Sequence, residues 1–161
     1  METLAPAFVY RHTKVRIVTE RPTEFIDLTE SLEGLVAQSH IVTGFLNVQS
    51  LHTTAAIVVN EGEPLLMKDF ECVLQQIAPS DVPYRHDDET VRTVNLSPGE
   101  RPNGASHCKA LLLGSSACLN ILNGRLLLGR WQRVFLVELD GPRARDISVL
   151  LMGEAAQCRS R

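Results

Sequence analysis

Long apolar runs are absent from this sequence. The longest, such as "ALLLG" and "RLLLGRW", fall far short of the roughly 20 residues that a membrane-spanning helix needs. The first residues, "METLAPAFVYRHTK", also lack the basic-then-apolar organisation of a secretion signal. We therefore expect no membrane contact and a cytoplasmic protein.

Cysteine is scarce, and an excess of positive charge is missing. The four cysteines, Cys72, Cys108, Cys118 and Cys158, form no CxxC or other metal-ligand spacing, so we expect reduced thiols. The formal net charge is -3, which argues against a broad nucleic-acid-binding surface. Any site for an anion must therefore be local.

The sequence also contains neither GxSxG nor a phosphate loop, so these two common catalytic motifs are excluded. What it does contain is 161 residues with 44% apolar content, enough to bury one core. We expect a single domain over residues 1–161, with residues 1–9 frayed.

Three segments have the apolar spacing of short helices, at residues 29–39, 63–79 and 104–114. The second opens with Pro64, which suits a first helical turn, and is stopped by Pro79. The third ends before a glycine, as helices commonly do.

Alternating or β-branched patterns predict six or seven strands. Residues 44–60 predict two strands or one bent strand, because polar residues interrupt them near Ser50 to Thr54. Asn123-Gly124 is a residue pair favoured in tight hairpins. Further strands are expected at 14–20, 132–140 and 145–153. Since strands and helices do not alternate regularly, the expected class is α+β with mainly antiparallel sheets.

Residues 80–104 predict a long loop, with at most a short extended piece at "VRTVNL". Loops of this length in compact domains tend to be functional or disordered. His86 and His107 lie near its ends, and His52 lies at the strand interruption. Three imidazoles from separate segments suit a zinc-type ion. Their spacings of 34 and 21 residues match no local zinc motif, so three independent surface histidines remain the alternative.

Glu138 interrupts an otherwise apolar strand, "VFLVEL". It shares a face with Val134 and Leu136, so it is either a sheet-edge carboxylate paired with an arginine or a site residue. In a site it would orient an imidazole or act as general base. Asn60 and Glu61 raise the same choice, because they end a strand and could simply form the turn before a helix.

Basic residues gather late in the chain. Five arginines, Arg125, Arg130, Arg133, Arg143 and Arg145, occur within 21 residues. Guanidinium groups suit phosphate oxygens, but such a series is more often a solvated strand face. Lys109, beside His107, is a further candidate for holding an anion.

Four blocks of this sequence together resemble the YjbQ family. "LHTTAAIVVNE" is similar to its HTSA…NE block, "YRHDD" to its Y-x-H-D element, and "NGASHCKALLLGSS" to its (A/S)-H-x-K…LG-(T/S)-S element. "NGRLLLGRWQRVFLVE" is similar to its G-x-(L/I)-x-x-G-x-WQ…E block. The blocks occur in order over about residues 10 to 154. The resemblance implies a small α+β protein, typically a homotrimer, with three histidines around a metal and a weak, secondary thiamine-phosphate synthase activity.

Carried onto this chain, the resemblance implies a role for each matching residue. The metal ligands would be His52, His86 and His107, with Asp87 behind them as a partner of these histidines rather than a ligand. Catalytic roles would fall to Asn60, Glu61 and Glu138, and substrate binding to Thr53, Thr54, Lys109 and Gln132. The chain departs from the pattern in three places: Thr54 stands where serine is usual, "NEGEP" is a shorter turn, and residues 90–104 lengthen the loop.

The reaction stays open between three hypotheses. Joining a pyrimidine diphosphate to a thiazole phosphate releases pyrophosphate, whose charge favours magnesium and basic side chains, whereas three imidazoles favour zinc. The same site would also serve a metal-dependent hydrolase in which Glu61 or Glu138 accepts a proton from water. The third hypothesis is a non-enzymatic trimer that binds a metal or a metabolite.

Overall fold

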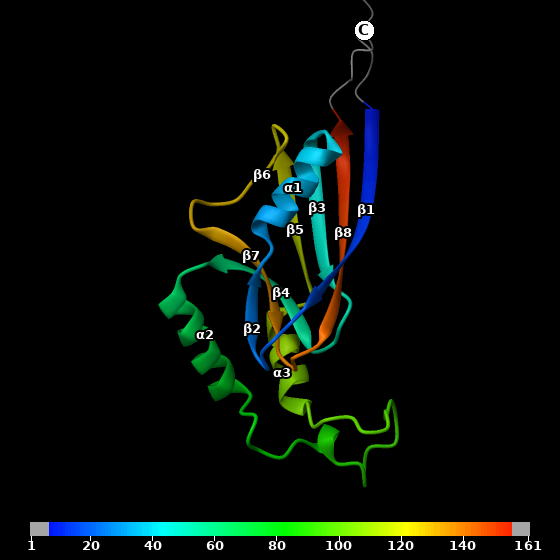
Figure 1. The fold of residues 1–161 in the computed structure, drawn as a ribbon, viewed down its shortest axis with the longest axis vertical. Helices are drawn as coiled ribbons and strands as arrows, with labels where there is room; N and C mark the ends of the chain where they lie inside the picture. Colours follow the sequence, from blue (N-terminus) through cyan, green and yellow to red (C-terminus); the bar gives the residue numbers. More distant parts are fainter. Residues whose placement is uncertain (1–6, 156–161) are drawn as a thin grey trace, which may run out of the picture.

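Two antiparallel sheets carry the fold in this computed structural model, which describes residues 7–155 (Figure 1). The larger has the strand order β1-β8-β3-β5-β6 and the smaller β2-β7-β4. The strands are β1 (Ala7–Val18), β2 (Glu24–Asp27), β3 (Ile41–Ser50), β4 (Ala55–Glu61), β5 (Ser116–Leu122), β6 (Arg125–Leu126), β7 (Gln132–Glu138) and β8 (Ala144–Ala155). The helices are α1 (Thr29–Ser39), α2 (Pro64–Ile77) and α3 (Gly104–Leu113), with a 3₁₀ turn, η1 (Arg85–Asp87). The expected α+β class with three helices and mainly antiparallel sheets is confirmed.

The three predicted helices form where local patterns placed them. In α2 the carboxylate of Glu63 accepts hydrogen bonds from the amides of Leu65 and Leu66, so the first turn is capped, and Pro64 occupies its favoured first position. The helix ends at Ile77 rather than at Pro79, because a residue before proline is disfavoured in helical conformation. None of the helices in residues 7–155 has the length and apolar content of a membrane-crossing segment.

The hairpin at Asn123-Gly124 is confirmed, since both residues have positive φ, 52° and 73°. The predicted interruption between Ser50 and Thr54 separates β3 from β4. Of the cysteines, Cys72, Cys108 and Cys118 are free thiols, and Cys158 lies outside the described residues.

One expectation about the strands was wrong, and one strand was not predicted. Residues 7–9 are not frayed, because β1 pairs with β8 along its whole length, from Ala7 opposite Ala155; residues 1–6 lie outside the described part. The strand β2 was not expected, since four residues are too few to show a period. The expected loop at residues 80–104 is confirmed, and "VRTVNL" contains no strand, because Arg92 donates to the carbonyls of Val94 and Asn95 and folds the segment onto itself.

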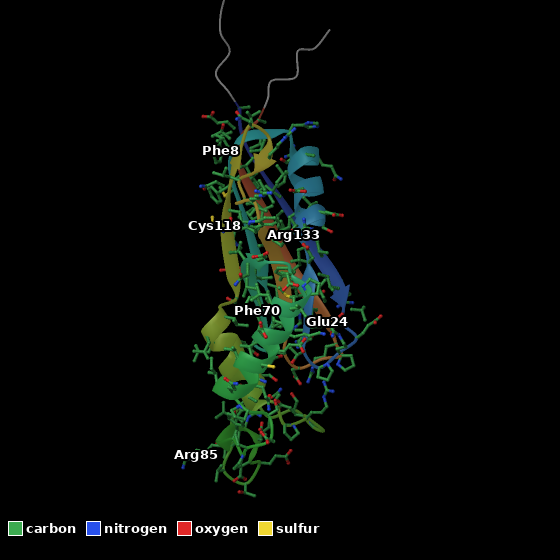
Figure 2. The ribbon with its side chains drawn as sticks, turned by 90° about the vertical axis from the view of Figure 1, so that its left-hand side faces the viewer. Phe8, Glu24, Phe70, Arg85, Cys118 and Arg133 are labelled. Carbon is green, nitrogen blue, oxygen red and sulfur yellow. The ribbon has the colours of Figure 1, made fainter. Side chains whose placement is uncertain are left out.

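The smaller sheet is buried on both faces. Leu136 of β7 joins the main core with Leu32 of α1 and Leu46 of β3, between the two sheets. Phe135, on the other face of β7, packs in a second cluster with Leu74 of α2. The segment between α2 and α3, marked by Arg85, lies at the end of the molecule opposite Phe8, as Figure 2 shows. This end contains the candidate site.

Candidate functional site

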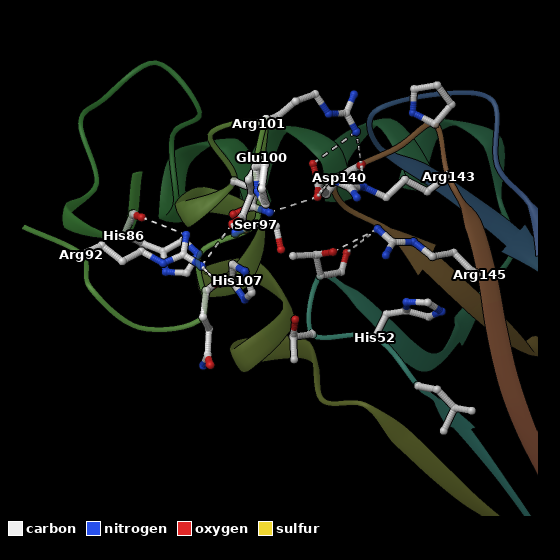
Figure 3. Close-up of a pocket in the computed structure, with 18 residues that line it drawn as sticks. His52, His86, Arg92, Ser97, Glu100, Arg101, His107, Asp140, Arg143 and Arg145 are labelled. Carbon is white, nitrogen blue, oxygen red and sulfur yellow. Dashed lines mark hydrogen bonds and ion pairs between the residues drawn. The ribbon is translucent and has the colours of Figure 1, made fainter. Parts of the chain in front are cut away.

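A cavity of about 830 Å³ opens where the β3–β4 turn, the β7–β8 turn, the loop after η1 and the start of α3 meet. All three predicted histidines line it. Figure 3 shows His86 and Arg92 on one side, His52 and Arg145 on the other, and His107 between them. The other side chains in its walls include Thr53, Thr54, Ser97, Glu100, Arg101, Asn103, Asp140 and Arg143.

Asp87 joins η1 to α3 and thereby brings two histidines together. Its Oδ1 accepts hydrogen bonds from the amides of Asn103 and Gly104, at 2.8 and 2.9 Å, at the start of α3. The ring centroids of His86 and His107 are consequently only 4.5 Å apart. Asp87 was expected as a partner of the metal ligands; the structure gives it contacts to the backbone that positions two of them.

The paired imidazoles have unused capacity for a ligand. Burial lowers the pKa of His107, and the neighbouring His86 lowers it further, so His107 is neutral at pH 7. The Nε2 atom of His86 is buried and has no hydrogen-bond partner among residues 7–155. A buried polar nitrogen without a partner is costly, and a ligand in the pocket would remove that cost.

His52 is held differently. Its Nε2 accepts a hydrogen bond of 2.8 Å from the amide of Asp146. Burial lowers its pKa, and Arg145 lowers it further. His52 also borders a smaller hollow together with His107, so the two face a common space.

The donor chemistry fits a zinc-type ion, but residues 7–155 do not gather three metal-ligating side chains into one cluster. In this arrangement His52 is not free to act as a ligand, because a neutral imidazole has one lone pair and that of His52 accepts from the Asp146 amide. In such a site His86 and His107 would be the two ligands that already lie together. His52 would join them after releasing its amide.

Glu138 lies beneath the pocket and does not line it. Its side chain is fully buried and accepts hydrogen bonds from Arg145, from Thr19 and from the amides of Leu139 and Asp140. Burial alone raises its pKa, but the bonds from Arg145 and the Asp140 amide outweigh burial and lower it overall. The carboxylate stays ionised and fixes Arg145, so its position does not favour the predicted catalytic role, which stays a prediction.

Asn60, Glu61 and Gln132 lie in a separate hollow of about 360 Å³, beside the exposed Trp131. The side chain of Asn60 accepts from the amide of Glu61, and that of Gln132 from the amide of Gly129. Within one chain these three predicted residues are therefore not brought to the histidine pocket.

Of the remaining predicted substrate-binding residues, two line the pocket and one does not. Thr53 and Thr54 line the pocket. Lys109 does not; it is buried, and its Nζ donates to Gln75 Oε1 and to Ser80 Oγ, both at 3.2 Å. Lys109 and His107 are two positions apart on α3, and such positions do not share a helix face.

The sequence interpretation missed the contribution of the loop. Arg92 donates to the carbonyls of His86, Val94 and Asn95 and pairs with Glu100 at 3.2 Å. These contacts fold the loop so that it forms one wall of the pocket. An arginine inside a stretch rich in proline, glycine and charge was the available signal, but its partners are mostly backbone carbonyls, which a sequence does not mark.

The chain is similar to known proteins along nearly its whole length. The family model described as UPF0047 protein YjbQ-like matches residues 13–154. A UPF0047 protein of Methanothermobacter thermautotrophicus is 40% identical over 136 residues, covering 84% of this chain and 87% of its own. UPF0047 protein YjbQ of Salmonella typhimurium is 33% identical over 145 residues, covering 85% and 94%.

Solved structures give the same result. A YbjQ-like protein of unknown function from Sulfolobus solfataricus P2 superposes with a TM-score of 0.82 at 32% identity, covering 92% of this chain and all of its own. A hypothetical protein from Aeropyrum pernix K1 gives 0.78 at 33% identity, covering 89% and 99%. The chain therefore belongs to the YjbQ family of UPF0047 proteins.

Proposed function

We propose that this protein is a metal-dependent enzyme acting on a small phosphorylated molecule in the histidine pocket. The observation that carries the proposal is the convergence of His52, His86 and His107 on one cavity from three segments far apart in sequence. Chance surface histidines would be expected to point into solvent separately.

The pocket's own residues support a ligand role for the histidine pair. His86 and His107 are held 4.5 Å apart by the attachment of η1 to α3, and the lowered pKa of His107 keeps its imidazole neutral, as a metal ligand must be. His52 completes the donor set in our proposal. A bound zinc-type ion supplies Lewis-acid polarisation of a substrate oxygen.

For the reaction we propose the one that the family resemblance implies, thiamine-phosphate synthesis from a pyrimidine diphosphate and a thiazole phosphate. The arginines in the pocket support a substrate with phosphate groups. The alternative hydrolase is less well supported, because Glu138 is engaged by five hydrogen bonds and Glu61 lies in another hollow. We also propose the homotrimer that the resemblance implies, which sedimentation tests; a mass near the 17.8 kDa of one chain would contradict it.

The shared premise is tested by metal analysis of protein purified without a histidine tag. We expect about one divalent ion per chain in the wild type, and its loss in His86→Ala and His107→Ala. His52→Ala should weaken retention as well. His12→Ala is the matched control, because His12, on the edge strand β1, forms a hydrogen bond with Ser148 of β8 and does not line the pocket.

Full metal occupancy in all three pocket variants would contradict the proposal. Formation of thiamine phosphate from the two precursors should disappear in the same variants and persist in the control. Tight metal binding without turnover of the precursors or of a phosphoester panel would instead favour the non-enzymatic binding protein.

A further inference from the structure

The arginines of the pocket are unevenly distributed around its walls. Four arginines line the cavity against two carboxylates, Glu100 and Asp140, although the whole chain carries a net charge of -3. Arg92 is matched by Glu100, but Arg101 and Arg143 share Asp140, at 3.6 and 2.7 Å. Since Arg145 is matched by Glu138 beneath the cavity, one positive charge remains unmatched, and Arg101 and Arg143 share it around Asp140. The β7–β8 turn and the start of β8 nevertheless form a wall that carries two of the four arginines.

Arg145 is the buried member of this wall. Its side chain is only 3% exposed, and its Nε and Nη2 both bind the carboxylate of Glu138. Since Glu138 is also fixed by Thr19 and two backbone amides, the guanidinium plane has little freedom to turn. The remaining nitrogen, Nη1, has no hydrogen-bond partner among the described residues, and Arg145 borders the cavity.

Thr54 supplies a second donor beside this arginine. Its Oγ1 accepts a hydrogen bond of 3.0 Å from Arg145 Nη2. A hydroxyl that accepts in this way still has its own hydrogen to donate, and no acceptor for it is found among residues 7–155. Thr54 lines the cavity next to Thr53.

We propose that Arg145, Thr54 and Arg143 form a subsite for a phosphate or diphosphate group, and that Glu138 is the positioning residue that orients Arg145. The donors come from three segments, the start of β8, the turn before β4 and the β7–β8 turn. Such a set surrounds a tetrahedral anion, whereas a planar carboxylate pairs best with a single free guanidinium fork. On Arg145 that fork is already occupied by Glu138.

This proposal rests on the proposed function only because the two sites lie in the same pocket. Anion binding at the subsite is therefore tested on protein without metal. The probe is inorganic pyrophosphate, titrated calorimetrically into the full chain after chelation and dialysis, with inorganic phosphate as a second probe. We expect Arg145→Lys to weaken pyrophosphate binding about tenfold to a hundredfold, because lysine lacks the third nitrogen and its fixed plane. Thr54→Val, which keeps the shape and removes the hydroxyl, should weaken it about tenfold.

The matched control is Arg125→Lys, which makes the same substitution at an exposed position on β6 outside the pocket and should change the affinity less than about twofold. If Arg145→Lys fails to fold, Thr54→Val decides alone, since it leaves the ion pair with Glu138 intact. For Glu138, the readout is Glu138→Gln: in a variant that remains folded by circular dichroism, a loss of pyrophosphate affinity with unchanged metal content supports positioning. Unchanged affinity in that folded variant would overturn the assignment.

The two proposals fail in different ways. Equal pyrophosphate affinity in wild type, Arg145→Lys and Thr54→Val, or no binding by the wild type at millimolar concentration, would overturn the subsite whatever the metal content. Loss of affinity in both variants supports it, even in a protein that retains no metal and so contradicts the proposed function.

Discussion

The ion pair between Glu138 and Arg145 makes a quantitative prediction about stability. In Glu138→Gln the side chain keeps its size, but the buried guanidinium of Arg145 loses its counter-charge, and an amide nitrogen replaces one of the accepting oxygens. Breaking a buried pair by removing one partner costs about 3–5 kcal/mol. Since single domains are stable by only about 5–15 kcal/mol, the variant should fold but be markedly less stable.

Urea denaturation followed by circular dichroism measures this loss. With a slope of about 1–3 kcal/mol per molar urea, the unfolding midpoint should fall by roughly 1–5 M. Glu33→Gln is the control, because Glu33 is an exposed carboxylate on α1 and should change the free energy of unfolding by less than about 0.5 kcal/mol.

The pH dependence has a definite sign. Burial raises the pKa of Glu138, but the hydrogen bonds from Arg145 and the Asp140 amide outweigh it, so the pKa is lowered in the folded state. The ionised carboxylate therefore stabilises the fold fully above its ordinary pKa of 4.5, and this stabilisation is lost as the pH falls through the folded value. The difference between wild type and Glu138→Gln should therefore narrow in acid. A difference below about 1 kcal/mol at pH 7, or one that does not change between pH 7 and pH 3, would refute the reasoning.

Three further substitutions test the surroundings of the pocket. Asp87→Ala removes the acceptor of two amides at the start of α3, so the free energy of unfolding measured in urea should fall by about 1 kcal/mol. It should also weaken metal retention, because His86 is no longer held against His107, and unchanged retention would contradict this. Gly104→Ala should cost about 1–3 kcal/mol, because an added Cβ would lie 2.5 Å from the Cβ of Tyr84, and a thermal midpoint equal to that of the wild type would show that the contact relaxes freely. Lys109→Met should leave pyrophosphate affinity unchanged, and lost binding would restore Lys109 as a substrate residue. It should also remove the rise of stability that the wild type should show as the pH approaches 10.5, because burial lowers the pKa of the lysine and its charged form opposes folding below that ordinary value.

The sequence could predict the elements that are determined by residues close together in the chain. The span of α2 followed from Pro64 and the apolar period, and the β5–β6 hairpin from Asn123-Gly124, because capping and positive φ are properties of neighbouring residues. The strand β2 escaped prediction, since it is defined by its pairing with β7 rather than by its own four residues.

The candidate site divides in the same way. Their positions between predicted elements, and then block similarity, singled out His52, His86 and His107, which do share a pocket. It could not reveal that the Asp146 amide occupies the lone pair of His52, or that Glu138 is enclosed beneath the pocket. The first fact depends on a contact between His52 and Asp146, which are 94 positions apart, and the second on the pairing of Glu138 with Arg145, seven positions further along. Both contacts form only when the sheets assemble.

The loop organised by Arg92 has a consequence for engineering. Its shape depends mainly on bonds from one side chain to carbonyls within residues 86–95 and to Glu100, rather than on either sheet. Residues 96–99, which include three pocket-lining positions, form the outer part of that wall and can be exchanged as a cassette while Arg92 and Glu100 are kept. The fold thus separates a fixed floor that carries His52 and His107 from a replaceable rim, and selection of variants for new ligands should begin at the rim.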